Sequence, residues 1–452
     1  MRAWVAAHVV VFGLLCLLTA AGGALRVEPA ANPSKYQSVD ERAYARLARN
    51  LARHGTYDAP EMADPVRWPP GAPFVFAAAH KIRPVITEGE RWDVPSAYPV
   101  QWAFSTATIP AVFVLALLLA GPVAGLVAAG AIAFYPPLIG VTGDLLTEPL
   151  GALVLTCALI AVVLALRRPS RWGAAGAGLA LGVTVLVRVD LVAVPFLVLA
   201  LFCAVVWRRL GRGVALRASA WMLGGILLLT LPWSIYASSV AGKPVPVSSG
   251  GASNLFVGTF TPGDGSMFGL KRELADEVRA RDPSLADEPF WRLPQQKVID
   301  TVAARRPSMD RESALRAAAF DNIRDHVLGD PLGFSAMSAR KVWRLWGDYT
   351  VGTYRNHRWW TTTYHLVLVA LGFLGLAAGL WRRRADFAAL AIVVGWVTLA
   401  NIALVSEARH NLPVMPVLVA GGVAGLWLLL EPRLAARRAA APAAPPAERV
   451  PA

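Results

Sequence analysis

The amino-acid sequence predicts an all-α polytopic membrane protein with about ten transmembrane helices and two large extracytoplasmic loops that contain amphipathic helices. Of its 452 residues, 56% are hydrophobic and only 16% are charged, and the mean hydropathy is +0.48. A soluble domain of this length cannot bury so large an apolar fraction. The apolar residues also form uncharged runs of about 18 residues or more, which is the length a helix needs to span a bilayer.

The first apolar run is Trp4–Leu25, which follows Arg2. A cleaved signal peptide is the alternative interpretation, because Gly22-Gly23-Ala24 resembles a cleavage site. The apolar core of a signal peptide is usually only about 7–15 residues long, so a retained first helix is favoured. Both interpretations place the segment that follows outside the cytoplasm.

The later apolar runs predict the other spans. They cover residues 99–120, 122–138, 146–166, 173–187, 190–207, 218–237, 363–381, 386–405 and 411–430. The run 173–187 would extend only about 22 Å as a helix, less than the hydrocarbon core of about 30 Å. It ends at Arg188-Val189-Asp190, and charged residues at such an interruption usually face protein or a water-filled cavity. A simple Arg–Asp pair near the interface and a site role are both open.

The charge distribution predicts the orientation of these spans. The formal net charge is +14, but the excess lies in short arginine-rich stretches without acidic residues, at 167–172, 208–217 and 382–384. Most acidic residues lie in the two long segments 26–98 and 239–360. Short basic loops stay in the cytoplasm, whereas long mixed-charge loops can be translocated. The positive charge is therefore a topology signal, and no nucleic-acid partner is expected.

The sequence predicts one transmembrane domain over residues 1–430, including the outer loops 26–98 and 239–360. Residues 431–452, rich in Ala, Pro and Arg, are expected to form a disordered cytoplasmic tail. The three cysteines fall within apolar spans and form no CxxC pair, so no disulfide framework is expected.

An acidic pair, Asp40-Glu41, opens an amphipathic helical pattern that runs to His54 in the first outer loop. An acid at this position can cap the free N–H groups of a helix start. The functional alternative is a general base held at the membrane surface.

Two further polar clusters lie between spans. Asp144 and Glu148 are four residues apart and could share one helix face, although Asp144 could equally cap the fourth span. Glu407-Ala408-Arg409-His410-Asn411 forms a tight turn between the last two spans. These residues could satisfy exposed backbone groups or place a cation over a cavity between helices.

Several common catalytic motifs are missing from the sequence, which contains no P-loop, HExxH, GxSxG or CxxC. The seven histidines are scattered, so a histidine-based metal site is not indicated. An enzyme of this kind would need a donor that is already activated and presented outside the cytoplasm.

Several motifs together resemble those of the GT-C glycosyltransferases, multispan enzymes that use polyprenyl-phosphate sugars and include the protein O-mannosyltransferases and the aminoarabinose transferases. The resemblance extends over roughly residues 5–430 and rests on motif order. The matching stretches are Asp40-Glu41-Arg42-Ala43-Tyr44, 67–73 (RWPPGAP), 144–149 (DLLTEP), 182–188, 248–258 (SSGGASNLFVG), 330–346 and 407–416 (EARHNLPVMP). His410 departs from the pattern, because many relatives have an aromatic residue there.

The resemblance implies an inverting transfer, in which an acid deprotonates an acceptor hydroxyl while the lipid phosphate leaves. It implies Asp40 as the base, within the Asp40-Glu41 motif, and Asp144 as the second choice. The implied phosphate partners are Arg67, Arg188, Arg340, Lys341 and Arg409. The remaining implied substrate-binding residues are Tyr44, Glu148, Asn254, Glu407 and His410.

The resemblance also implies the partners and the location. The donor would be a polyprenyl-phosphate sugar, and the acceptor a cell-envelope glycan, lipid or protein. The chain would lie in the plasma (inner) membrane with its active site outside, and a divalent metal is possible because some relatives bind one. The alternatives are a transporter or lipid-linked sugar flippase without catalysis, and a scaffold whose loops bind cell-wall partners.

Overall fold

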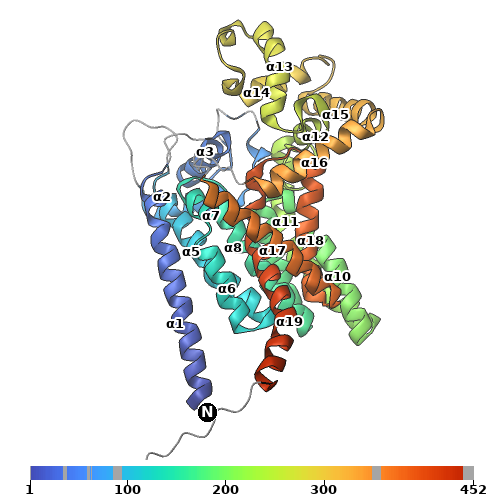
Figure 1. The fold of residues 1–452 in the computed structure, drawn as a ribbon. Helices are drawn as coiled ribbons and strands as arrows, with labels where there is room; N and C mark the ends of the chain where they lie inside the picture. Colours follow the sequence, from blue (N-terminus) through green and yellow to red (C-terminus); the bar gives the residue numbers. More distant parts are fainter. Residues whose placement is uncertain are drawn as a thin grey trace, which may run out of the picture.

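The computed structural model describes residues 2–33, 38–58, 62, 64–84, 94–348 and 358–440, and every regular element in these ranges is helical. Figure 1 shows a bundle of long helices that carries smaller helices at one end. The bundle consists of α1 (Arg2–Leu25), α5 (Ala97–Ala120), α6 (Pro122–Ala133), α7 (Pro136–Gly140), α8 (Glu148–Arg167), α9 (Arg171–Val187), α10 (Val194–Leu210), α11 (Arg212–Ala241), α17 (Trp359–Trp381), α18 (Ala385–Ala403) and α19 (Met415–Ala440).

The membrane-spanning pattern confirms the predicted polytopic all-α class. In the described ranges, eight helices are long and apolar enough to cross a bilayer. The segments Pro122–Ala133 and Pro136–Gly143 pass the same test together but are bent by 58° at their break, as in a broken span or a re-entrant loop, and α9 is a shorter apolar helix. These elements correspond one to one with the predicted runs.

Two predicted boundaries differ from the structure. The third run is broken after Ala133, because Pro136 and Pro137 lack the N–H groups that would continue the helix. The last helix, α19, continues to Ala440, so residues 431–440 are helical rather than part of the predicted disordered tail. Residues 441–452 of that tail lie outside the described ranges.

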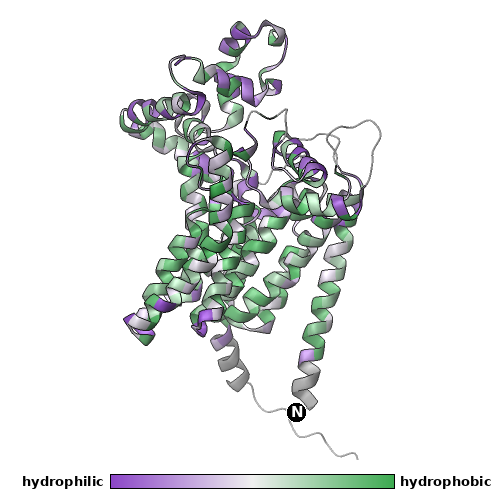
Figure 2. Cartoon of the chain, turned by 180° about the vertical axis from the view of Figure 1, so that it is seen from behind, coloured by the Kyte–Doolittle hydropathy of each residue, from purple (hydrophilic) through white to green (hydrophobic). Residues whose placement is uncertain are grey.

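The two long loops lie at the same end of the bundle, here named the loop end, and the arginine-rich turns lie at the other, the arginine end (Figures 1 and 2). In Figure 2, hydrophilic residues concentrate at these two ends, and the bundle between them is mostly hydrophobic. The arginine end contains the α8–α9, α10–α11 and α17–α18 turns. This arrangement agrees with the topology predicted from charge.

The first long loop begins with a short helix and a capped amphipathic helix. Its helices are α2 (Val27–Ala31), α3 (Val39–His54), η1 (Pro65–Arg67) and α4 (Gly71–Ile82). At the start of α3, the Ser38 hydroxyl accepts a hydrogen bond from the Glu41 N–H, and Glu41 accepts one from the Ser38 N–H. This capping box fixes where α3 begins, and Gly55 (φ 74°) ends it in a left-handed conformation.

The second long loop folds into several short helices with an apolar core of their own. They are α12 (Gly251–Thr259), η4 (Thr261–Gly263), α13 (Met267–Arg281), η5 (Pro283–Leu285), η6 (Phe290–Arg292), α14 (Gln295–Ala303), α15 (Arg311–Asn322), the π-helical turn η7 (Ile323–Leu328) and α16 (Pro331–Gly347). The helical region of this loop is broken at Asp330-Pro331, where α16 begins, and Leu332 and Trp343 are exposed on α16.

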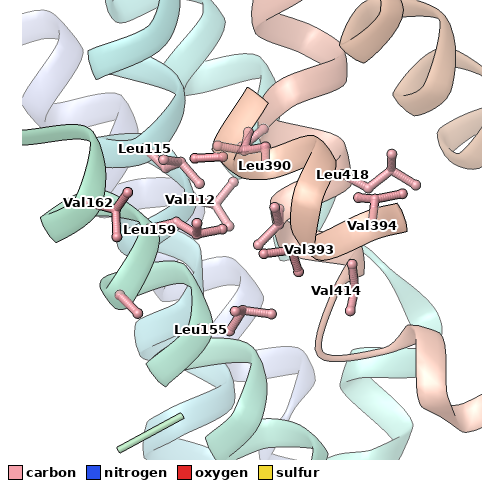
Figure 3. Close-up of a cluster of buried hydrophobic side chains, with 14 of the residues drawn as sticks. Val112, Leu115, Leu155, Leu159, Val162, Leu390, Val393, Val394, Val414 and Leu418 are labelled. Carbon is pink, nitrogen blue, oxygen red and sulfur yellow. The ribbon is translucent and has the colours of Figure 1, made fainter. Parts of the chain in front are cut away.

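Tight packing of small and branched residues joins the bundle helices. Figure 3 shows side chains of α5, α8, α18 and α19 pointing toward one another, including Val112, Leu159 and Leu418. Between α17 and α19, a Cβ added at Gly375 would lie 1.8 Å from the Gly422 carbonyl oxygen. Only glycine allows these two backbones to approach so closely. The close approach of these glycines joins α17 to α19 within the bundle.

Candidate active site

A cavity of about 200 Å³ lies at the loop end, where α3, η1, the start of α8, the end of α9, α12, α14 and the α18–α19 connection meet. Most residues predicted for the site line this cavity, although they are far apart in the sequence. The predicted residues among its lining are Asp40, Tyr44, Arg67, Glu148, Arg188, Asn254, Glu407, Arg409 and His410.

Asp40 lies in the first turn of α3, which the capping box positions. One carboxylate oxygen accepts a hydrogen bond from the Trp68 indole N–H at 3.1 Å, and the other pairs with the Arg409 guanidinium. Burial of Asp40 opposes ionisation, but the charge of Arg409 and these two hydrogen bonds outweigh it and hold the pKa of the carboxyl below its usual range. Asp40 is therefore an ionised, oriented carboxylate.

Arg409 lies in the turn η8 (Ala408–Asn411), which connects α18 to α19. Its guanidinium pairs with Asp40, donates to Glu407 at 2.8 Å and lies 3.9 Å from Glu148. The positive charge of Arg409 lowers the pKa of Glu407, although burial opposes this. One guanidinium thus holds carboxylates from three separate parts of the chain.

Arg188, which follows the short helix α9, is also paired. It binds Asp190 through two hydrogen bonds of 3.0 and 2.8 Å, lies 3.4 Å from Glu148 and donates to the Thr147 hydroxyl. The Arg–Asp pair and the position at a cavity, which the sequence left as alternatives, therefore occur together. Because Glu148 faces both Arg188 and Arg409, it links the two cationic groups.

Arg67 differs from the other two arginines of the cavity. Within the described ranges, its guanidinium makes no hydrogen bond or ion pair, and it lies 5.8 Å from the centre of the Trp68 ring. A Cβ added at Gly250 would lie 3.3 Å from the Arg67 Cγ, so the glycine leaves room for this side chain. Burial and the neighbouring Arg311 lower the pKa of Arg67, but a guanidinium stays charged at neutral pH. Its donors are available to an anion.

Four predicted site residues are not brought to the cavity. Both carboxylate oxygens of Glu41 accept hydrogen bonds from backbone N–H groups, of Ser38 and Leu145, so Glu41 serves as a cap. Lys341 is buried and donates to the carbonyls of Gly258 and Ile402. The other two are Asp144, which is buried outside the lining, and Arg340, which is exposed on α16.

The structure supports neither interpretation of Asp144, on one helix face with Glu148 or as the cap of the fourth span. Asp144 is extended (φ −111°, ψ 142°), and α8 begins only at Glu148 with Thr147 as its N-cap residue. The two acids therefore do not share a helix face. The Asp144 backbone carbonyl instead accepts a hydrogen bond from Gln101, which ties this loop to α5.

Sequence reasoning missed several residues that line the cavity. Trp68 was noted only as part of a proline-rich turn, although it binds Asp40. Asn401, whose amide oxygen lies 2.9 Å from His410 Nδ1, is a lone amide in the apolar helix α18, and such a residue was a usable signal. Gln295 and Gln296 carried no signal, because they reach the cavity only through the folding of the second loop over it.

The donor set does not fit a divalent metal. Within the described residues, no three histidine, cysteine, aspartate or glutamate side chains form a group that could hold a metal ion. The carboxylates of Asp40, Glu148 and Glu407 converge instead on Arg409, whose positive charge partly neutralises them. The polar side-chain groups that line this cavity include carboxylate, guanidinium, imidazole and amide groups.

This fold is the GT-C-like multispan fold that the sequence motifs predicted. No protein-family model matches the chain, and no curated protein matches it. Among solved structures, the chain is similar to the apo oligosaccharyltransferase of Archaeoglobus fulgidus, with a TM-score of 0.55 and 16% identity over 96% of this chain and 52% of that one.

Two further solved structures are also similar to the chain. The A. fulgidus oligosaccharyltransferase AglB with an inhibitory peptide and a dolichol-phosphate gives a TM-score of 0.53 at 16% identity, covering 96% of this chain and 52% of that chain. ArnT from Cupriavidus metallidurans bound to undecaprenyl phosphate gives a TM-score of 0.40 at 16% identity, covering 97% of this chain and 81% of that chain. The chain spans about half the length of the oligosaccharyltransferase, and the likeness shows a shared fold.

Proposed function

We propose that this protein is a membrane glycosyltransferase that moves a sugar from a polyprenyl-phosphate donor to a cell-envelope acceptor on the extracytoplasmic face. One observation carries the proposal. A single cavity at the loop end of the bundle contains an ionised, oriented carboxylate, Asp40, and an arginine, Arg67, whose guanidinium makes no hydrogen bond or ion pair with a carboxylate among the described residues. A base and an anion-binding cation are the two groups that such a transfer needs.

In the proposed reaction, the acceptor hydroxyl gives its proton to Asp40, and its oxygen attacks the anomeric carbon of the sugar. The bond from that carbon to the phosphate oxygen breaks, and its electron pair leaves with the lipid phosphate. Attack on the face opposite the phosphate inverts the anomeric configuration. Arg67 binds the phosphate, where its planar fork can contact two oxygens.

The paired residues support this reaction indirectly. Arg409 and Trp68 hold the two Asp40 oxygens in place and keep the carboxylate charged, so the base is ready before the acceptor arrives. The dolichol-phosphate in the oligosaccharyltransferase structure is a ligand of the proposed chemical type on the same fold. These features support a lipid-phosphate donor without specifying the sugar.

The proposal is tested with the purified chain in lipid nanodiscs and polyprenyl-phosphate donors radiolabelled in the sugar. We expect release of lipid phosphate and transfer of the label to an added envelope fraction. Empty nanodiscs provide the control. A second arm uses sealed vesicles with the same donors, where movement of the intact lipid between leaflets without cleavage would contradict the proposal and favour a flippase.

A further inference from the structure

A second, larger cavity adjoins the candidate active site. Its volume is about 860 Å³, within the usual range of about 300–1,000 Å³ for small-molecule sites. It is enclosed by α3, η1, the end of α11 and the α14–α15 region. The two cavities share Val39, Trp68 and Gln296 in their linings, so they meet along a common border.

The border lies directly beside the proposed base. Trp68 donates its indole N–H to Asp40, and Val39 precedes Asp40 on α3. On the other side of the border, the Gln296 side-chain oxygen accepts a hydrogen bond from Arg311 at 2.7 Å. A molecule in the larger cavity that extends a hydroxyl past Trp68 would therefore reach the region of Asp40.

The lining of the larger cavity mixes apolar side chains with charged ones, and the charges of the two signs balance. It contains four basic side chains, Arg42, Arg46, Lys243 and Arg311, and four acidic ones, Asp64, Asp300, Asp310 and Glu312. Several are fixed by partners within the wall: Arg311 donates to Asp300 at 2.6 Å, and Lys243 lies 3.7 Å from Glu312. The Arg42 side chain makes no hydrogen bond or ion pair within the described ranges and is exposed.

This chemistry selects among acceptor classes. A lipid tail would need a continuous apolar wall, and a polyanion would be favoured by an excess of cations. A mixture of fixed carboxylates and guanidinium groups instead offers hydrogen-bond acceptors and hydrogen-bond donors to many neutral hydroxyl groups. The Trp68 ring at the border adds a flat apolar surface for the C–H face of a sugar ring.

We infer that the larger cavity is the acceptor site, and that the acceptor is the end of a neutral glycan whose terminal hydroxyl reaches Asp40 past Trp68. The inference rests on the proposed transferase function, which it deepens by naming the acceptor class. A peptide and an acidic glycan are the other outcomes of the test.

The test measures binding to the full chain in nanodiscs. The probes are fluorescently tagged short neutral oligosaccharides, matched acidic oligosaccharides that contain uronic acid, and peptides. We expect a neutral oligosaccharide to bind wild type, and Arg311→Ala and Arg42→Ala to weaken it roughly tenfold, because each removes a charged hydrogen-bond donor. Arg42→Ala breaks no interaction of the described fold, so its effect cannot come from unfolding.

The matched control is Arg53→Ala, which removes an exposed arginine from the same helix, α3, outside both cavities. It should bind the oligosaccharide as wild type does. Binding of only peptide or acidic probes, no neutral binding, or neutral binding that both cavity variants leave unchanged would each overturn the inference.

A parallel assay separates this inference from the proposed function. It measures release of lipid phosphate, and transfer of the label, from labelled donor by wild type with each class of probe as the acceptor. Donor cleavage together with transfer only to peptide would support the proposed transferase function and overturn the inference of a neutral-glycan site. Glycan binding that the cavity variants weaken, in a protein that cleaves no donor, would keep the site and overturn the transferase.

Discussion

At the scale of single residues, the three arginines of the cavity differ in what already binds them. Arg409 and Arg188 are occupied by carboxylates, whereas Arg67 has no such partner within the described part of the chain. Removing a partner of a buried ion pair costs about 3–5 kcal/mol, so variants of Arg409 and Arg188 would test the fold as well as the site. Arg67 is the residue where binding can be tested without that complication.

Arg67→Ala should raise the KM for the polyprenyl-phosphate donor by roughly 10- to 100-fold, because a hydrogen bond to a charged group contributes about 1.5–3 kcal/mol. The KM of Arg67→Lys should lie between those of wild type and Arg67→Ala, since lysine keeps the charge but loses the bidentate contact. Steady-state kinetics with a fixed acceptor measure this. An unchanged KM in Arg67→Ala would remove Arg67 from the phosphate site.

The environment of Asp40 predicts how the rate of sugar transfer depends on pH. Arg409 and the two hydrogen bonds lower the folded-state pKa of Asp40 below the ordinary value of about 3.9, so the carboxylate stays charged down to lower pH than in the unfolded chain. The rate should therefore show no loss attributable to the base between about pH 8 and pH 5. An acidic limb in kcat/KM with a midpoint near pH 6 would indicate another base.

The sequence predicted the chemical types of the site better than their roles. Asp40, Arg67 and Arg409 were identified from local motifs, and they do line one cavity. Local sequence could not show that Lys341 is consumed by two backbone carbonyls, or that Gln296 reaches the cavity from a distant helix. Both depend on how the second loop packs against the bundle, which is a tertiary property.

At the scale of elements, α16 is held in place by Lys341. Its ammonium group donates to Gly258 near the end of α12 and to Ile402 near the end of α18, where helix carbonyls lack partners. This lysine therefore joins the second loop to the helix that precedes the Arg409 turn. Its role in the structure is capping.

Lys341→Met should destabilise the protein, because two buried carbonyls lose their donor at about 1–3 kcal/mol each. Arg340→Ala, at the exposed neighbouring position, should change stability by no more than about 0.5 kcal/mol. Thermal unfolding in detergent compares the two variants. Equal stability would contradict the capping role, and a raised donor KM in a fully stable Lys341→Met would return the residue to the site.

Element boundaries were predictable where local chemistry sets them. A proline marks the break at Asp330-Pro331, and Glu41 of the acidic pair forms the capping box at the start of α3, whereas Asp40, the expected cap, lies inside the helix. The bend between α6 and α7 was missed, although Pro136 and Pro137 signalled it, because the apolar run continued across them.

At the scale of the whole molecule, the two long loops share one end of the bundle and the arginine-rich turns share the other. The positive-inside rule then predicts that the arginine end lies in the cytoplasm. The cavity at the loop end would face outward, where a translocated lipid-linked sugar is accessible.

This orientation is testable by cysteine labelling in intact cells, after Cys16, Cys157 and Cys203 are replaced by alanine. A membrane-impermeant thiol reagent should label Arg272→Cys on α13 from outside, because this position is exposed at the loop end. Arg382→Cys, exposed at the arginine end, should react only after permeabilisation. The reverse pattern would contradict the outward-facing site.

The central claim is that Asp40 acts as the base of a sugar transfer, and one comparison tests it most directly. Wild type and Asp40→Asn are assayed at matched expression for sugar transfer from radiolabelled polyprenyl-phosphate donors, with unfolding curves to verify the fold. Because a general base contributes about 10²- to 10⁴-fold, the account predicts a loss of that size in a folded variant. Full transfer by a folded Asp40→Asn protein would contradict it.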